Sequence, residues 1–395
     1  MGIKNRSKSV RIKEAAIKDG INYIIGLSKI PIPLEIVKEV IDIKKEESTS
    51  HFVDWELKNW PKIYSQELQK CLKLLYKGKE FLLPQVLIFD NTEKQLKMSN
   101  IYFHLLEKPF TLREDIRALT EELFEKLLNY LRKKKRYSNQ QNLRLISIRE
   151  ECKKVVLEVQ PVEYKHYVHT NLLLDAKSKG KEQTLREYCH SHGKIEELIA
   201  SPLANHLGIN ILLFTADGSC IMQKRSKKVA VYIGELCAAA SGAVSLTDIP
   251  SKETTLEEMP KLREGFEEIG ISITDIPKDQ IFFLGITREL IRGGKPEMFF
   301  FGKTNLSEKQ VIEKWKDAKD KWEASDLVFF HFGKIAFENL VYENKIHEFL
   351  CKVDDFIEKH IEESSISLLT NLALWVKYRL KTEGRLDDDD LGNVA

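Results

Sequence analysis

The stretch Arg263–Ile271 reads REGFEEIGI and carries three glutamates, Glu264, Glu267 and Glu268, at spacings of three and four residues. If the stretch is helical, this spacing places the three carboxylates on one face. Like charges so placed repel by about 0.2–0.5 kcal/mol per pair. Arg263 supplies only one positive charge, so the pattern predicts a divalent cation that prefers oxygen ligands, Mg2+ or Mn2+. The alternative is a solvated acidic face, in a chain of which 31% of the residues are charged.

The same stretch resembles the second half of the Nudix hydrolase signature, G-x5-E-x7-R-E-U-x-E-E-x-G-U, where U is a bulky aliphatic residue. Six residues match it in place: Arg263, Glu264, Glu267, Glu268, Gly270 and Ile271. Gly265 stands where an aliphatic residue is usual. In the first half, Gly242 is followed at the signature's distance by Asp248 in place of glutamate, and fourteen residues rather than seven then precede Arg263. The resemblance covers about residues 205 to 305.

A Nudix resemblance implies a metal-dependent hydrolase that cleaves a phosphoanhydride bond in a nucleotide or a nucleoside diphosphate derivative. It implies that Glu264, Glu267 and Glu268, with the carbonyl of Gly242, hold Mg2+ or Mn2+. Glu264 would also help to deprotonate water, and Arg263 would hold the glutamates in place, so that Arg263, Glu264 and Glu267 form the catalytic set. The expected substrate contacts are Arg225, Arg288, Arg292, Lys295 and Glu297. Arginine and lysine suit phosphates, although strand edges also carry them for solubility.

Two other readings of the acidic stretch stay open. A Nudix fold kept as a nucleotide-binding or sensing module would tolerate the longer loop, Asp248 and Gly265. An unrelated α/β protein with a charged helix would match by coincidence. Retention of all three helix glutamates favours the enzyme, because binding alone does not need that cluster.

The composition excludes several broad classes. With 62 Lys and Arg against 60 Asp and Glu, the net charge of +2 gives no global field for nucleic acid or membrane. Residues 1–19 are basic and could contact nucleic-acid phosphates, but a solvated terminal helix is the favoured interpretation.

Six scattered cysteines without a C-x-x-C pair fit reduced thiols in a cytoplasmic protein. No apolar run is long enough for a spanning helix. The oligomeric state is left open.

The predicted fold class is α/β (α+β), in three parts. Residues 1–204 are predicted to form a mixed α/β domain. Residues 205–381 are predicted to form a Nudix-like mixed sheet between helices, with a C-terminal helical extension. Residues 382–395 are predicted to be a disordered tail because they are rich in aspartate.

Local patterns predict the following elements. Helices are expected over 112–136, 184–200, 334–361 and 364–381, and after the capping pair Ser307 and Gln310. Strands are expected at 81–90, within 142–175, and on both sides of the turns at 216–218 and 292–295. Residues 249–259 are expected to form an exposed loop. The CHSH run at 189–192 suggests a metal site, but no second ligand pair accompanies it, so ordinary histidines are favoured.

Overall fold

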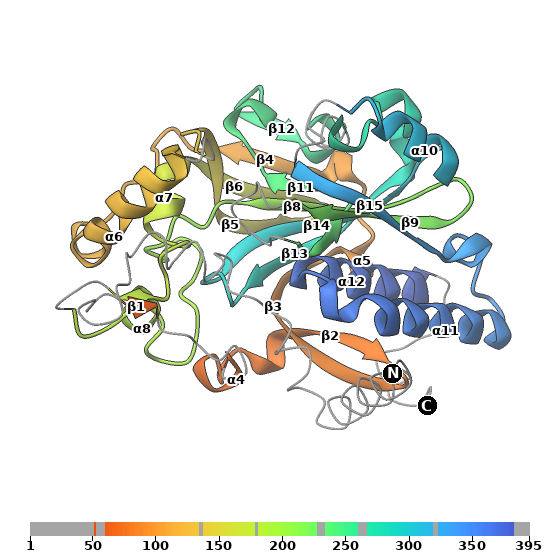
Figure 1. Cartoon of the computed structure of the whole chain (residues 1–395), viewed down its shortest axis with the longest axis horizontal. Coiled ribbons are helices and arrows are strands. Elements are labelled where there is room, and N and C mark those ends of the chain that lie inside the picture. Colours follow the sequence, from red (N-terminus) through yellow and green to blue (C-terminus); the bar gives the residue numbers. More distant parts are fainter. Residues whose placement is uncertain are drawn as a thin grey trace, which may run out of the picture.

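The computed structural model describes residues 51–52, 60–133, 137–177, 181–226, 234–259, 267–318 and 323–382. Strands form a nine-stranded, a four-stranded and a two-stranded sheet, with helices around them (Figure 1). The predicted α+β class is confirmed at this level. The first residue of the predicted disordered tail, Thr382, is the last residue of a helix. The other tail residues, 383–395, lie outside the described residues.

The nine-stranded sheet has the order β10-β9-β8-β14-β13-β3-β2, with β11 on β8 and β15 on β9. Its strands are β2 (Cys71–Tyr76), β3 (Lys79–Asp90), β8 (Gly208–Phe214), β9 (Ser219–Arg225), β10 (Leu236–Ala238), β11 (Ala240–Ala243), β13 (Ile281–Glu289), β14 (Lys295–Lys303) and β15 (Ala324–His331). The pair β14–β8 is parallel and the other pairs are antiparallel, so the sheet is mixed.

The predicted Asp-Gly turn joins β8 to β9. Gly218 has a φ of +85°, a conformation that glycine adopts without steric cost. A Cβ at this position would lie 2.0 Å from the carbonyl oxygen of Gly333, so glycine is also required by the close approach of that backbone. The predicted strands on both sides of 292–295 are β13 and β14.

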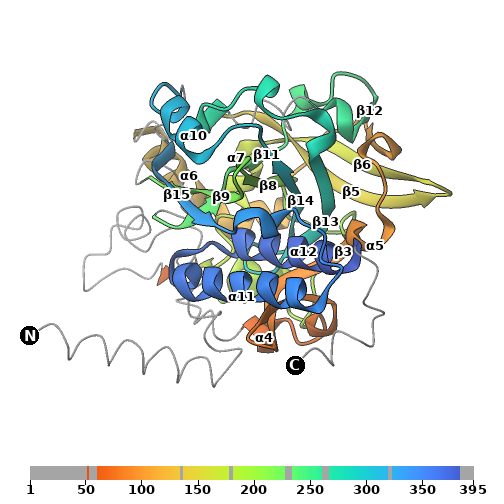
Figure 2. The ribbon, with the colours of Figure 1, turned by 90° about the vertical axis from the view of Figure 1, so that its right-hand side faces the viewer.

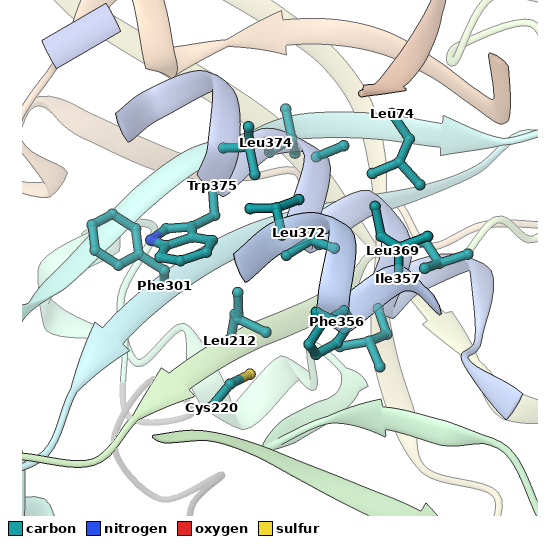
Figure 3. Close-up of a cluster of buried hydrophobic side chains, with 14 of the residues drawn as sticks. Leu74, Leu212, Cys220, Phe301, Phe356, Ile357, Leu369, Leu372, Leu374 and Trp375 are labelled. Atoms are coloured by element: carbon teal, nitrogen blue, oxygen red, sulfur yellow. The ribbon is translucent and has the colours of Figure 1, made fainter. Parts of the chain in front are cut away.

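Two long helices, α11 (Glu343–His360) and α12 (Ile366–Thr382), cover one face of the large sheet (Figure 2). α12 matches the helix predicted over 364–381. The helix predicted over 334–361 begins only at Glu343, because residues 333–336 form a separate 3-10 turn and residues 337–342 are not helical. Leu212 and Phe214 of β8 and Phe301 of β14 share a core with Trp375 of α12 (Figure 3). The rings of Phe214 and Trp375 lie 4.7 Å apart. Alternate strand residues therefore face the helices, as the two-residue strand period requires.

The opposite face of the large sheet packs on the four-stranded sheet and on α10 (Glu308–Trp315). The small sheet has the order β12-β4-β6-β5, with β4 (Ile101–Leu105), β5 (Gln141–Glu151), β6 (Lys154–Glu163) and β12 (Glu253–Thr255). Ile209 and Ile211 of β8 share this second core with Val311 of α10. Ser307 and Gln310 form the predicted capping box at the start of α10.

The remaining helices and short strands lie around the two larger sheets. They are α4 (Trp60–Ile63), α5 (Asn91–Lys94), α6 (Glu114–Lys133), α7 (Tyr164–His169), α8 (Leu185–Cys189), and the short strands β1 (His51–Phe52) and β7 (Ala176–Lys177). Of these, α5 lies beside α12 and β13. The predicted helix over 112–136 is confirmed as α6, whose apolar stripe Ile116, Leu123, Leu127 and Leu131 is buried. Its last predicted residues, 134–136, lie outside the described ranges.

Three local predictions are wrong. Residues 164–175, predicted as part of a strand, form α7 and buried turns, because a short apolar run has no periodicity that separates strand from helix. The helix predicted over 184–200 ends at Cys189, and Gly193 follows in a turn with a φ of +73°. Residues 249–259 are not an exposed loop. Thr254 of β12 pairs with Phe103 of β4, and Leu256 and Met259 are fully buried.

Strands from both sides of the predicted boundary at 204 and 205 share the large sheet. β3 from the N-terminal side pairs antiparallel with β13, for example Phe89 with Ile286. β2 continues the sheet beyond β3 and contacts α12. The sheet therefore joins the two predicted parts through backbone hydrogen bonds.

Candidate functional site

The acidic stretch is described only from Glu267 onwards, so Arg263 and Glu264 lie outside the described residues. Glu267–Ile269 forms a single 3-10 turn, with Glu268 half-buried. Gly270 follows with a φ of +75°, and a Cβ there would lie 2.4 Å from the carbonyl oxygen of Lys314 at the end of α10. This left-handed glycine ends the helical turn, as expected for a helix C-cap.

Apolar neighbours fix the position of this turn. Ile269 and Ile271 are fully buried and belong to the core that contains Val311 and Phe283. That core lies on the face of the large sheet opposite to α12. The backbone that carries Glu267 and Glu268 is therefore anchored between α10 and the sheet.

The residues predicted from the first half of the signature lie on β11 and just after it. Gly242 pairs with Ile209 of β8 and is exposed. Asp248 is 6% exposed, and its carboxylate accepts hydrogen bonds from the backbone N–H and hydroxyl of Ser245 at 2.7 and 2.8 Å. The Asp248 carboxylate thus caps its own turn.

Three of the predicted substrate contacts come together in a buried ionic network on the α12 face of the sheet. Arg292 follows β13 and donates hydrogen bonds to Glu289, with an Nε–Oε2 distance of 2.8 Å, and to Glu297. Lys295, at the start of β14, contacts Glu297 Oε1 at 2.7 Å. All four side chains are at most 7% exposed. We call Glu289, Arg292, Lys295 and Glu297 the buried ionic network.

Strand register explains why these side chains meet. Glu289 is paired with Lys295 across β13 and β14, and Glu297 with Gly208 across β14 and β8, so all project from the same face. Gly208 leaves room for this arrangement, because a Cβ there would lie 2.4 Å from Lys295 Nζ.

Two neutral polar side chains also donate hydrogen bonds to the Glu297 carboxylate. Its Oε2 accepts hydrogen bonds from Asn210 Nδ2 of β8 at 3.1 Å and from Ser367 Oγ of α12 at 2.8 Å. On the other side of β13, Thr287 donates to Gln85 of β3 at 2.6 Å. A band of polar side chains thus crosses four neighbouring strands beneath α12. Asn210, Ser367, Thr287 and Gln85 were not predicted as site residues, although each is a polar residue in a run of apolar strand or helix residues.

The charges in this network balance. Burial alone would raise the pKa of Glu297, but Arg292 and Lys295 outweigh it and lower that pKa to about 2. Burial lowers the pKa of Lys295, and Glu297 opposes this shift. Two cations and two carboxylates therefore neutralise one another, the condition under which buried charges are tolerated.

The other two predicted substrate contacts lie apart from this network. Arg288 is 5% exposed and donates to the carbonyl oxygens of Gly294 at 2.9 Å and Glu196 at 2.5 Å. Arg225, at the end of β9, forms a 3.0 Å ion pair with Glu323. The structure therefore joins Arg292, Lys295 and Glu297 to each other. It does not join them to the turn of Glu267 and Glu268, which packs on the other face of the sheet.

Comparisons with known proteins provide no family for this chain. No model of a protein family matches the sequence, and no curated protein is detectably similar to it. Within the described ranges, no cluster of three or more His, Cys, Asp or Glu side chains could hold a metal ion, but Glu264 of the predicted set lies outside those ranges. In the same ranges no helix is both long and apolar enough to cross a membrane.

Proposed function

We propose that this protein is a Nudix-type hydrolase that uses Mg2+ or Mn2+ to cleave a phosphoanhydride bond in a nucleotide or a nucleoside diphosphate derivative. The observation that carries the proposal is the REGFEEIGI stretch, whose glutamates stand three and four residues apart before Gly270. The left-handed Gly270, seated against the backbone of Lys314, supports it, because the signature places a glycine at this helix end. A mixed sheet with helices on both faces also agrees with the proposed fold.

The donor set fits the proposed metal. Glu264, Glu267 and Glu268 offer carboxylate oxygens, and Gly242 offers a carbonyl oxygen from an exposed strand position. Hard divalent cations prefer such oxygen ligands. A bound metal supplies Lewis-acid polarisation of a phosphoryl oxygen and a lowered pKa for water. In this proposal Arg263 would hold the glutamates in place, and Glu264 would complete the metal ligands or help to deprotonate water.

The five proposed substrate contacts differ in how readily their side chains could bind a phosphate. Arg292, Lys295 and Glu297 already use their charges on one another, and Arg288 binds two carbonyl groups. Arg225, whose side chain is 15% exposed and pairs with a single glutamate, is the best placed of the five to exchange its partner for a phosphate. We propose that the buried ionic network holds β13, β14 and α12 in place.

A second candidate is a Nudix-fold module that binds or senses a nucleotide without cleaving it. It is favoured by Asp248, which replaces the signature's glutamate and caps its own turn. It is also favoured because Arg292, Lys295 and Arg288, three of the four predicted cationic substrate contacts, already bind groups within the protein. This module would bind the same ligands as the enzyme but would not turn them over.

One assay separates the candidates. Purified full-length protein is incubated with nucleoside diphosphate sugars, dinucleoside polyphosphates and nucleoside triphosphates, with Mg2+, with Mn2+ or with EDTA. Product release and ligand binding are both measured. Metal-dependent cleavage supports the enzyme, and metal-dependent binding without cleavage supports the sensor. If neither occurs with any ligand, the acidic stretch is a solvated helix face.

A further inference from the structure

A cavity lies between α4 and the turn that follows α8. Its volume is about 720 Å3, within the range of small-molecule sites. It is lined by Lys62, Ile63, Ser65, Gln66, Arg186, Glu187 and residues 190–193. None of these residues belongs to the acidic stretch or to the predicted substrate contacts.

The floor of this cavity is a rigid, buried hydrogen-bonded unit. Arg186 binds Asp175 through Nε at 2.5 Å and Nη2 at 2.8 Å, and it donates through Nη1 to the Tyr64 hydroxyl at 2.5 Å. The same guanidinium donates to the carbonyl oxygens of Leu290 at 3.0 Å and Ile291 at 2.5 Å. All its nitrogens are used within the protein, so Arg186 positions the floor and does not bind a ligand directly.

The floor sets the tautomer of His190. The Tyr64 oxygen accepts from Arg186, and its hydroxyl lies 2.9 Å from His190 Nδ1, so we assign the hydroxyl as the donor and Nδ1 as the acceptor. The ring proton of neutral His190 is therefore on Nε2. No described residue accepts a hydrogen bond from this Nε2–H. Burial and the charge of Arg186 lower the pKa of His190 to about 3, so the ring stays neutral at physiological pH.

The rim adds further donors. Lys62 is exposed and forms no ion pair with any residue that the structure describes. Ser65 and Ser191 contribute exposed hydroxyl groups. The one carboxylate of the lining, Glu187, is engaged in the cap of α8, where it accepts a 2.7 Å hydrogen bond from the backbone of Thr184. The donors offered by the lining are therefore the ring N–H of His190, the ammonium of Lys62 and the hydroxyls of Ser65 and Ser191.

We propose that this cavity binds the phosphate group of a small phosphorylated molecule. A phosphate monoester has three strong acceptor oxygens, which match the imidazole N–H of His190, the ammonium of Lys62 and the hydroxyls of Ser65 and Ser191. Among the described lining residues, Lys62 is the cation that is not already paired with a carboxylate, and the other proposed donors are neutral. The cavity is large enough to hold the rest of a sugar phosphate or a nucleoside monophosphate beside the phosphate group.

The test uses isothermal titration calorimetry with inorganic phosphate, ribose 5-phosphate, AMP and unphosphorylated ribose, at constant ionic strength. The protein is the full chain carrying Glu267→Gln, in EDTA, so that the proposed metal site does not contribute. Ribose 5-phosphate and AMP are expected to bind, and ribose is not. Lys62→Gln and Ser191→Ala should each weaken binding at least fivefold. Lys309→Gln, the same change at an exposed lysine on α10, should leave it unchanged.

A second measurement tests whether His190 contacts the bound phosphate. In a 15N spectrum of the histidine side chains, ribose 5-phosphate should shift the Nε2–H resonance of His190 and leave that of exposed His347 in place. Absence of binding by every phosphate compound would overturn the proposal. So would binding that Lys62→Gln and Ser191→Ala both leave unchanged. Neither result depends on catalysis, so this test does not decide the proposed hydrolase activity, which the cleavage assay tests separately.

Discussion

Ser367, in the first turn of α12, donates a 2.8 Å hydrogen bond to Glu297, which lies seventy residues earlier on β14. The same carboxylate pairs with Lys295 and Arg292. One buried carboxylate thus links the C-terminal helix, the centre of the large sheet and the β13–β14 turn. The stability of the sheet should therefore depend on the charge balance at this point.

Replacing Glu297 by glutamine should strongly destabilise the protein. The change leaves Arg292 and Lys295 with Glu289 as their only carboxylate in the network, and removing one partner of a buried ion pair costs about 3–5 kcal/mol. The measurement is the free energy of unfolding in urea. Glu125→Gln, the same change at an exposed position of α6, should have little effect. Equal stabilities for the two variants would mean that the network contributes nothing.

Replacing Glu267 by glutamine should slow the proposed hydrolysis roughly 10²- to 10³-fold, because losing one metal-binding carboxylate removes about 3–4 kcal/mol of transition-state stabilisation. Stability should hold or rise slightly, because repulsion between neighbouring carboxylates is relieved. The rate of phosphoanhydride cleavage is measured at saturating Mg2+, with a thermal melt of the same sample. Glu257→Gln, at a nearby exposed glutamate, is the control and should keep full activity. Full activity of the Glu267 variant would exclude these carboxylates from catalysis.

Replacing Gly270 by alanine should cost more stability than the same change at Gly78. Both residues have positive φ angles, +75° and +68°, so both variants lose about 1 kcal/mol to backbone strain. A Cβ at Gly78 meets nothing within 4 Å, whereas one at Gly270 would lie 2.4 Å from the carbonyl oxygen of Lys314. The difference between the two melting temperatures therefore measures how tightly the acidic stretch is seated on α10. Similar losses would mean that the stretch moves aside freely.

Stability should fall as the pH is lowered from about 6.5 towards 3. Burial lowers the pKa of both His190 and His206 to about 3, whereas an unfolded histidine titrates near 6.5. The unfolded chain binds more protons in this window, so the free energy of unfolding decreases with falling pH, by at most about 1.4 kcal/mol per pH unit for each histidine. Glu297 adds to the loss below about pH 4.5, because its pKa is about 2 in the folded protein.

This pH prediction is measured by urea unfolding between pH 7.5 and 4. Proton NMR of the histidine rings supplies the control. His190 and His206 should not titrate above pH 4, because burial lowers the pKa of each ring to about 3. A stability that is flat between pH 6.5 and 4 would show that the buried rings are protonated in the folded state as well.

The sequence by itself determined the elements whose signals are local. The apolar steps of three and four residues predict α6, the Ser307–Gln310 pair predicts the start of α10, and Asp217–Gly218 predicts the turn between β8 and β9. Each of these signals is an interaction between residues within one turn or one helix, so neighbours along the chain are sufficient to produce it. The α+β class follows from the same patterns.

Tertiary structure alone decided which segments pair and which charges are buried. β3 pairs with β13 almost two hundred residues away, and β12 pairs with β4, so residues predicted to form an exposed loop become an edge strand. Arg292, Lys295 and Glu297 have the same residue types as a solvent-facing phosphate site. Only the register of β13, β14 and β8 beneath α12 turns them towards one another, because a side chain's partners depend on which strand lies beside its own.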